Sequence, residues 1–252
     1  MAPTIAPPQG LAPGHARLAP SAASRWLTCA ASITLNDGVD VHDESGPEAL
    51  AGSIIHAAFE RAMRYGTGCF NDTELHVLDF DCGCSAASAR RILDDALSMA
   101  RIAIALNGVD HLWLEQRVVP RIGRSDVWGT ADVVGYASRR ARLLVFDLKT
   151  GRWKVDVDHN DQCLVYALGA LDLMHELRLP VREARLVIAQ PSLGPRAMSS
   201  WAPTLDVLAQ FRAFLIARAA ETDAPAAEPN PSEETCRFCP ARSRCPVHQA
   251  EV

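Results

Sequence analysis

The sequence lacks both a long hydrophobic run and an export signal. Hydrophobic residues make up 48% of the 252 residues and charged residues 22%, but no apolar stretch approaches the roughly 18 residues that a membrane-spanning helix needs. The N-terminus alternates Ala and Pro and has no basic region followed by an apolar core. This pattern is typical of a flexible arm rather than of a signal peptide. We expect a cytoplasmic protein without a membrane partner.

Common catalytic signatures are missing as well. The chain has no G-x-S-x-G elbow, no G-x-x-x-x-G-K-S/T phosphate loop and no H-E-x-x-H pair, which argues against serine hydrolases, P-loop enzymes and zinc proteases of those types. The formal net charge of −5 argues against sequence-independent coating of nucleic acid, although it is compatible with a local basic groove.

The chain is organised as an arm, one domain and a tail. We place a flexible arm at residues 1–20, the domain at 21–222, and a Pro-rich linker with a cysteine tail at 223–252. Hydrophobic periodicity predicts helices at 21–35, 47–63, 86–106, 160–177 and 204–220, and strands at 112–119, 127–137, 142–150, 184–191 and 197–201. We expect Ser21 to cap the first helix and a loop containing Cys69, Cys82 and Cys84 to precede the helix at 86–106. This order predicts an α/β fold with a mixed central sheet flanked by helices.

Two carboxylates and an ammonium group come together on the central predicted strands. Residues i and i+2 of a strand face the same side, so Asp147 and Lys149 project together. If the neighbouring strands pair as a hairpin, Asp132 lies alongside, and a divalent cation relieves the repulsion between the two carboxylates. Hard oxygen ligands suit Mg²⁺ or Mn²⁺; the expected ligands are Asp132, Asp147, the backbone carbonyl of Leu148 and His56. Taken alone, these residues also fit an ordinary strand-end ion pair and a turn cap.

Two helical pairs accompany this group. Gly52 and His56 lie four residues apart on one helix face, as do Gln162 and Tyr166 on the helix after the central strands. The glycine allows close backbone approach beside the imidazole. The amide and the phenol can hydrogen-bond phosphates or bases and stack on a nucleotide. Each pair by itself is equally compatible with core packing.

The tail carries a cluster of thiols. Cys236, Cys239 and Cys245 have the spacing Cys-x2-Cys-x5-Cys, and without an export signal such thiols indicate metal rather than disulfides. A fourth ligand is needed. His248 would complete a local zinc site, whereas Cys29 would complete a set of four cysteines for a 4Fe-4S cluster.

The motifs Gly52/His56, Gly129/Asp132, Asp147/Lys149 and Gln162/Tyr166 resemble, in order and spacing, those of the RecB-like branch of the PD-(D/E)XK nuclease superfamily. The resemblance runs from Gly52 to Tyr166 and on to the C-terminal cysteines. Iron-sulfur members, which include the AddB nuclease domain and the CRISPR adaptation nuclease, carry one cysteine before the nuclease motifs and three after them. A phage-encoded RecB-like family has a similar arrangement.

The resemblance implies a restriction-endonuclease-like core and a metal-dependent deoxyribonuclease. The implied catalytic residues are His56, Asp132, Asp147 and Lys149. Lys149 would orient or help to deprotonate the attacking water and would stabilise charge on the phosphate. The implied substrate-positioning residues are Gln162 and Tyr166. Glu115, on the preceding strand, would be an additional acidic contact to a second metal or to water, although a solvated glutamate on a strand is the commoner explanation for such a residue.

The resemblance also implies a cofactor and partners. A 4Fe-4S cluster held by Cys29, Cys236, Cys239 and Cys245 would pack the tail against the N-terminal helix. The expected substrate is DNA, single-stranded or with free ends, cleaved by an exonuclease in phage DNA recombination, replication or processing in the bacterial host cytoplasm. A helicase, a recombination partner or a second copy of the chain could assist. A non-catalytic DNA-binding or assembly module and a zinc-stabilised nuclease stay open as alternatives.

Overall fold

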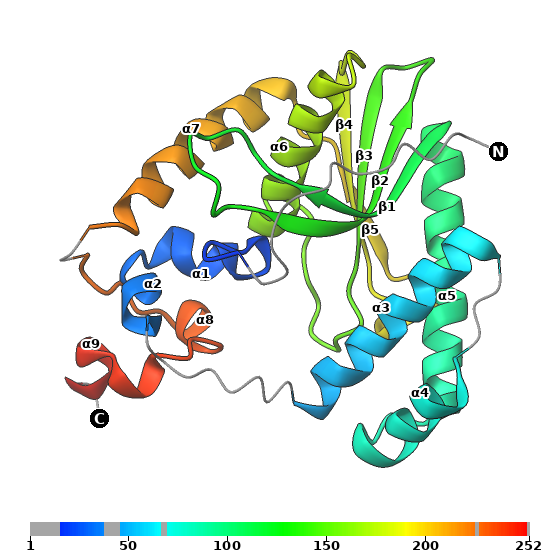
Figure 1. The fold of residues 1–252 in the computed structure, drawn as a ribbon, viewed down its shortest axis with the longest axis horizontal. Helices are drawn as coiled ribbons and strands as arrows, with labels where there is room; N and C mark the ends of the chain where they lie inside the picture. The colour runs from blue at the N-terminus through cyan, green and yellow to red at the C-terminus, as the bar shows by residue number, and fades with distance from the viewer. Residues whose placement is uncertain (1–15, 38–45, 67–69, 225–226, 251–252) are drawn as a thin grey trace.

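The protein is built around a five-stranded mixed sheet (Figure 1), in a computed structural model that describes residues 16–37, 46–66, 70–224 and 227–250. The strands, in both chain and spatial order, are β1 (His111–Val118), β2 (Gly129–Ala137), β3 (Arg142–Leu148), β4 (Glu183–Ala189) and β5 (Met198–Trp201). Only β3 and β4 pair in parallel; the other neighbours are antiparallel. The predicted α/β fold with a mixed sheet flanked by helices is confirmed.

Helices cover both faces of the sheet (Figure 1). One face carries α6 (Asp161–Glu176), which connects β3 to β4, together with α7 (Leu205–Glu221) and α1 (Ala23–Thr28); the other carries α3 (Pro47–Tyr65) and α5 (Ala86–Asn107). The side chains of β3 alternate between two separate cores, so the central strand is apolar on both sides. The charged residues at its end are therefore exceptional.

Local sequence signals explain where α3 and α5 begin and end. Pro47 opens α3 at a position where its missing N–H costs nothing, and Gly66 closes it in the left-handed region, with φ 74°. The Ser85 side chain accepts from the backbone of Ser88 at the start of α5, and Gly108 ends that helix with φ 67°. The predicted helices at 47–63 and 86–106 are confirmed.

A short helix occupies part of the segment predicted as a loop before α5. α4 (Asp72–His76) begins with a capping box between Asn71 and Glu74, and a π-helical turn, η2 (Val77–Asp81), buries Leu78 completely. The loop prediction was wrong here, although the N-x-x-E signature stood in the sequence. Cys82 and Cys84 lie just beyond as free thiols; Cys69 lies outside the described residues.

The predicted helix at 21–35 is two helices instead of one. α1 ends at Thr28, and α2 (Ala31–Asn36) begins after Cys29, whose φ of −123° and ψ of 87° are not helical. Ser21 does not cap α1, because it lies within a 3-10 turn, η1 (Pro20–Ala22). Because Cys29 lies between the two helices, its sulfur can contact the tail. The backbone amide of Asn230 donates to this sulfur at 3.3 Å.

Part of the predicted arm is packed. Residues 1–15 lie outside the described residues, but Leu18 has no exposed surface, and its amide donates to the carbonyl of Asp126 at 3.1 Å. Pro20 is also buried. The packed domain therefore begins no later than residue 16, five residues before the boundary that composition predicted.

The C-terminal tail lies beside α1 and α2 (Figure 1). It contains α8 (Glu233–Cys236), a 3-10 turn η4 (Arg242–Arg244) and α9 (Pro246–Ala250). The Arg25 guanidinium donates to the backbone carbonyl of Phe238 at 3.3 Å. The side-chain amide of Asn230 donates to the backbone carbonyl of Thr28 at 3.2 Å. Within the described part of the chain, none of the helices combines the length and hydrophobicity that crossing a membrane requires.

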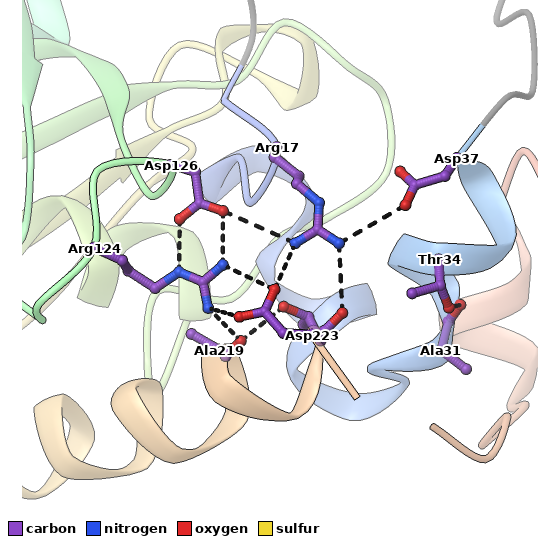
Figure 2. A network of polar contacts seen from close by, with 9 residues as sticks. Arg17, Ala31, Thr34, Asp37, Arg124, Asp126, Ala219 and Asp223 are labelled. Carbon is purple, nitrogen blue, oxygen red and sulfur yellow. Dashed lines mark hydrogen bonds and ion pairs between the residues drawn. The ribbon is translucent and has the colours of Figure 1, made fainter. Parts of the chain in front are cut away.

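An ion-pair network joins the N-terminal segment, the β1–β2 connection and the end of α7 (Figure 2). Arg124 holds Asp126 through two hydrogen bonds of 2.6 and 2.7 Å, and it reaches Asp223 at 2.9 Å. Arg17 lies 3.0 Å from Asp223 as well. The hydrogen bond from Arg124 is the largest cause of the lowered pKa of both Asp126 and Asp223.

We expect Arg124→Gln to lower the free energy of unfolding by about 1–2 kcal/mol at pH 7, because two charge-assisted contacts are lost from a partly exposed site. A carboxylate with a lowered folded-state pKa stabilises the protein above its unfolded pKa and loses that effect as the pH falls through the folded value. The difference should therefore shrink towards pH 3 in urea titrations. Arg139→Gln, an exposed change in the β2–β3 turn, is the control; equal losses at both pH values would contradict the account.

Candidate functional site

The side chains that the sequence singled out line one open cleft of about 620 Å³. The predicted residues that line it are His56, Glu115, Asp132, Asp147, Leu148, Lys149, Gln162 and Tyr166. They come from α3, the first three strands and the start of α6, so the fold brings together segments that are far apart in the chain. The cleft lies at the C-terminal end of β3, beside the start of the connection to α6.

Asp132 is the centre of one half of the cleft. It is buried, with 8% of its surface exposed. One carboxylate oxygen lies 2.8 Å from Nδ1 of His56, and the other accepts the backbone amide of Leu148 at 2.6 Å. Burial alone would lower the pKa of His56, but the hydrogen bond and charge of Asp132 raise it overall. The contact of Leu148 here comes from its amide, and the ligand role of its carbonyl stays a prediction.

The strand residue opposite Asp132 has a strained backbone. Glu115 has φ 48°, a left-handed conformation that costs free energy for a non-glycine residue. Regular alternation would place Trp113 and Val118 on opposite faces of β1, yet both belong to the same core. The alternation thus reverses at Glu115, which turns its carboxylate towards α3.

This reversal brings a carboxylate from β1 to the site around Asp132. His56, Glu115 and Asp132 each offer a ligand atom, and these atoms lie within 4.8 Å of one another. An imidazole and two carboxylates in this arrangement are compatible with a divalent cation. Without a cation, burial and then the charge of Asp132 raise the pKa of Glu115 to about 7.

Asp147 is the centre of the other half of the cleft. Its exposed fraction is 3%. Lys149 Nζ lies 2.9 Å from Oδ2, and Gln162 Nε2 lies 3.3 Å from Oδ1. Oδ2 is buried, and the Lys149 ammonium is the partner that balances its charge. Burial raises the pKa of Asp147 more than Lys149 lowers it.

Gln162 connects the remaining polar groups. Its carbonyl oxygen accepts from Lys149 Nζ at 2.6 Å, and its amide nitrogen lies 3.0 Å from the Tyr166 hydroxyl. Burial would lower the pKa of Lys149, but Asp147 raises it above its ordinary value, so Lys149 is held as an ammonium. The i, i+4 pair on α6 therefore positions both charged groups.

Two glycines permit this approach. A side chain at Gly129 would place its first carbon 2.7 Å from the ring of Pro20 and 2.9 Å from the ring of Tyr166. A side chain at Gly52 would meet the Thr150 hydroxyl at 2.8 Å. Both distances are shorter than van der Waals contact. A side chain at Gly129 would therefore clash with two rings, whereas at Gly52 the Thr150 hydroxyl would have to rotate away.

We expect Glu115→Gln to stabilise the metal-free protein by about 1–2 kcal/mol at pH 8, after discounting for partial exposure. A carboxyl whose folded pKa is raised loses stability as the pH increases from about 4.5 to about 7. The neutral amide avoids that loss, so its advantage should be small at pH 5. Urea titrations in EDTA at both pH values test this, with the exposed Glu228→Gln as control. An equal effect at pH 5 and at pH 8 would contradict the raised pKa of Glu115.

The four predicted cluster ligands line a second, enclosed cavity between α1, α2 and the tail. These residues are Cys29, Cys236, Cys239 and Cys245. Arg25 and Ser32 line the same cavity. The Nε of Arg25 and the hydroxyl of Ser32 are buried and have no hydrogen-bond partner among the described residues. The cysteines in the described residues form no disulfide.

His248, the alternative fourth ligand, lies elsewhere. It lines a neighbouring groove, which shares Cys236 and Arg242 with the thiol cavity, and its Nε2 is 2.9 Å from the side chain of Arg242. All four cysteines line the cavity itself, whereas His248 is not part of its lining. This arrangement could not be decided from the spacing of the tail alone.

Sequence reasoning missed some residues around both sites. Glu60 and Thr150 line the cleft, and neither belongs to a recognisable motif. Arg25 and Ser32 at the thiol cavity lie on helices that the sequence predicted as one continuous element. Their packing against the tail depends on the break at Cys29, for which the sequence carries no proline or glycine signal.

Comparison with known proteins gives the family of the chain but not an activity. The chain belongs to the family described as "Protein of unknown function (DUF2800)", whose model matches residues 15–252. A solved structure described as "Crystal structure of SSO0001" is similar at 16% sequence identity, covering 79% of this chain and 85% of its own, with a TM-score of 0.35. A likeness at that level carries no argument about function.

Proposed function

We propose that the protein is a divalent-metal-dependent deoxyribonuclease similar to the RecB-like PD-(D/E)XK enzymes, and that the cleft is its active site. One observation carries the proposal. Side chains chosen from sequence patterns on separate segments converge in a single cleft, where Lys149 contacts both Asp147 and Gln162. A chance set of common residues would not be expected to meet in this way.

The residues present fit a divalent cation. Asp132 and Asp147 are both buried, and two buried carboxylates without a cation are costly. Asp147 lines the same cleft as Asp132, and Glu115 and Asp132 lie close to His56. These groups would hold Mg²⁺ or Mn²⁺, whose preferred ligands are oxygens.

A bound divalent cation supplies a water of lowered pKa and charge stabilisation for a phosphate. Lys149 is protonated, so its ammonium would donate to the phosphate or orient the water rather than remove a proton from it. The Gln162 amide holds Lys149 in place at 2.6 Å. Tyr166, whose pKa is raised by burial, stays a neutral phenol that can donate to the substrate.

A non-catalytic DNA-binding module is the second candidate. It would keep the fold without needing a buried carboxylate pair and an ammonium group in contact. Because Asp147 carries a desolvation cost in this structure, its retention supports catalysis over a purely architectural role. A role in phage DNA recombination, replication or processing rests on the family resemblance alone.

The test is digestion of end-labelled DNA by the full chain in Mg²⁺, Mn²⁺ or EDTA. The substrates are single-stranded and double-stranded DNA, each linear and circular. We expect cleavage in Mg²⁺ or Mn²⁺ that EDTA abolishes, with loss of activity on circles if the enzyme acts from ends. DNA binding without cleavage in either metal would favour the binding module, and cleavage that persists in EDTA would contradict a metal-dependent site.

We also propose that the thiol cavity holds a 4Fe-4S cluster. Four cysteines line it, as such clusters require. Buried polar groups of Arg25 and Ser32 that lack partners could donate to cluster sulfurs, which is a common outer contact of such groups. Zinc bound by three cysteines and His248 is less well supported, because His248 lies in another groove. The cluster would join α1 to the tail and add its binding free energy to folding.

A further inference from the structure

We propose that Trp153, Arg237 and Phe238 form a platform on which bases of single-stranded DNA stack before the strand enters the cleft. This inference rests on the proposed nuclease function and names its substrate class. Trp153 lies in the connection between β3 and α6, and the other two residues follow directly after α8. Arg237 and Phe238 stand between the first two cysteines of the tail motif, whereas no motif marks Trp153.

The platform is continuous with the cleft. A groove of about 650 Å³ runs from Lys149 and Gln162, which also line the cleft, to Trp153, Arg237 and Phe238. A strand whose phosphate lies beside Lys149 would therefore pass along this groove. The fold provides one path from the charged site to the aromatic residues.

The two aromatic side chains of the platform are largely exposed to solvent. Trp153 is 67% exposed and Phe238 is 76% exposed. The Arg237 guanidinium lies 4.2 Å from the Trp153 ring centroid and 5.5 Å from that of Phe238. It limits the motion of both rings by cation–π contact, and the uncovered ring surface remains available to a base.

Charge on the groove wall favours bases over phosphates. Asp161, Glu233 and Glu234 also line the groove, and carboxylates repel a phosphate backbone. Base faces are neutral and stack on aromatic rings without sequence preference. A duplex hides its base faces between neighbouring pairs, so this groove suits an unpaired strand.

The platform depends on the thiol cavity for its position. Arg237 and Phe238 directly follow Cys236, and the Phe238 carbonyl accepts from Arg25 at 3.3 Å. Arg25 and Cys236 both line the thiol cavity. The tail that carries the thiols therefore also presents part of the substrate groove, which gives the proposed cluster a role in substrate binding.

The test measures binding of a short fluorescein-labelled oligothymidylate to the full chain by fluorescence anisotropy. An Asp147→Asn background with EDTA keeps the DNA intact. We expect Trp153→Ala and Phe238→Ala each to weaken binding by at least about fivefold, since one base stack is lost in each. Trp153→Phe should restore most of the affinity. Phe214→Ala removes a ring that is 46% exposed on α7 and should change nothing.

Two further readouts separate this inference from the nuclease proposal. Hydrolysis of bis(p-nitrophenyl) phosphate, which is too small to reach the platform, should be equal in the native protein and in a Trp153→Ala, Phe238→Ala double variant. Unchanged oligothymidylate binding by the double variant, or equal loss for duplex DNA and the single strand, would overturn the platform whether or not the protein cleaves DNA. Absence of hydrolysis in the native protein would count against the nuclease alone.

Discussion

Asp147→Asn should reduce the rate of metal-dependent DNA cleavage by at least about a thousandfold, roughly 4 kcal/mol of transition-state stabilisation. Asparagine keeps the shape of the side chain and removes its charge. The buried Oδ2, which lies 2.9 Å from Lys149 Nζ, would no longer offer a charged ligand to the cation. Single-turnover cleavage of a labelled oligonucleotide in Mn²⁺ measures this loss.

The same substitution should leave the melting temperature in EDTA unchanged or higher. Burial raises the pKa of Asp147 and outweighs the effect of Lys149, so the charged form is unfavourable in the folded state at neutral pH. A neutral amide removes that cost, and its carbonyl oxygen can still accept from the Lys149 ammonium, which limits the loss from removing one charge of the pair. Loss of activity with retained or increased stability is expected of a residue selected for function. Asp94→Asn, exposed on α5, is the control, and a variant that retains full activity would refute the role of Asp147.

Cys29→Ser should have the largest effect on stability. If the four thiols hold a 4Fe-4S cluster, removing one ligand should abolish most of the broad absorption near 400 nm that such clusters show. The free energy of unfolding should fall by several kcal/mol, because cluster binding is linked to folding. The measurements are the visible spectrum and iron content after anaerobic purification, together with the melting temperature.

Two comparisons separate the cluster from the zinc alternative. Cys84→Ser alters a thiol outside the cavity and should change neither iron content nor stability. His248→Ala should also be neutral, since the imidazole lies in a neighbouring groove. A colourless protein whose zinc is lost in His248→Ala but kept in Cys29→Ser would contradict the four-cysteine assignment.

The strands and the main site residues could be predicted because their signals are local. Alternation marks β1 to β3 as neighbouring strands, and the period of two places Asp147 beside Lys149 whatever the rest of the chain does. The i, i+4 rule likewise places Gln162 near Tyr166, which the structure confirms with a distance of 3.0 Å. These relations depend only on backbone geometry.

Other features depend on contacts between distant segments. The left-handed conformation of Glu115 is stable only because the neighbouring strand and α3 constrain it, and no glycine or asparagine marks the position. Helix propensity alone would continue the first helix through Cys29. The packing of Leu18 against the β1–β2 connection could not be read from a segment rich in Ala and Pro. In each case tertiary packing overrides the local pattern.

The central claim is that the cleft holds the divalent cation of a phosphodiester hydrolysis. Anomalous diffraction from a crystal of the protein soaked in Mn²⁺ tests it most directly. The account predicts one strong peak within roughly 2.5 Å of Asp132 and of Asp147 or Glu115, and no such peak after Asp132→Asn. A manganese peak elsewhere, with an empty cleft in a protein that cleaves DNA, would contradict it.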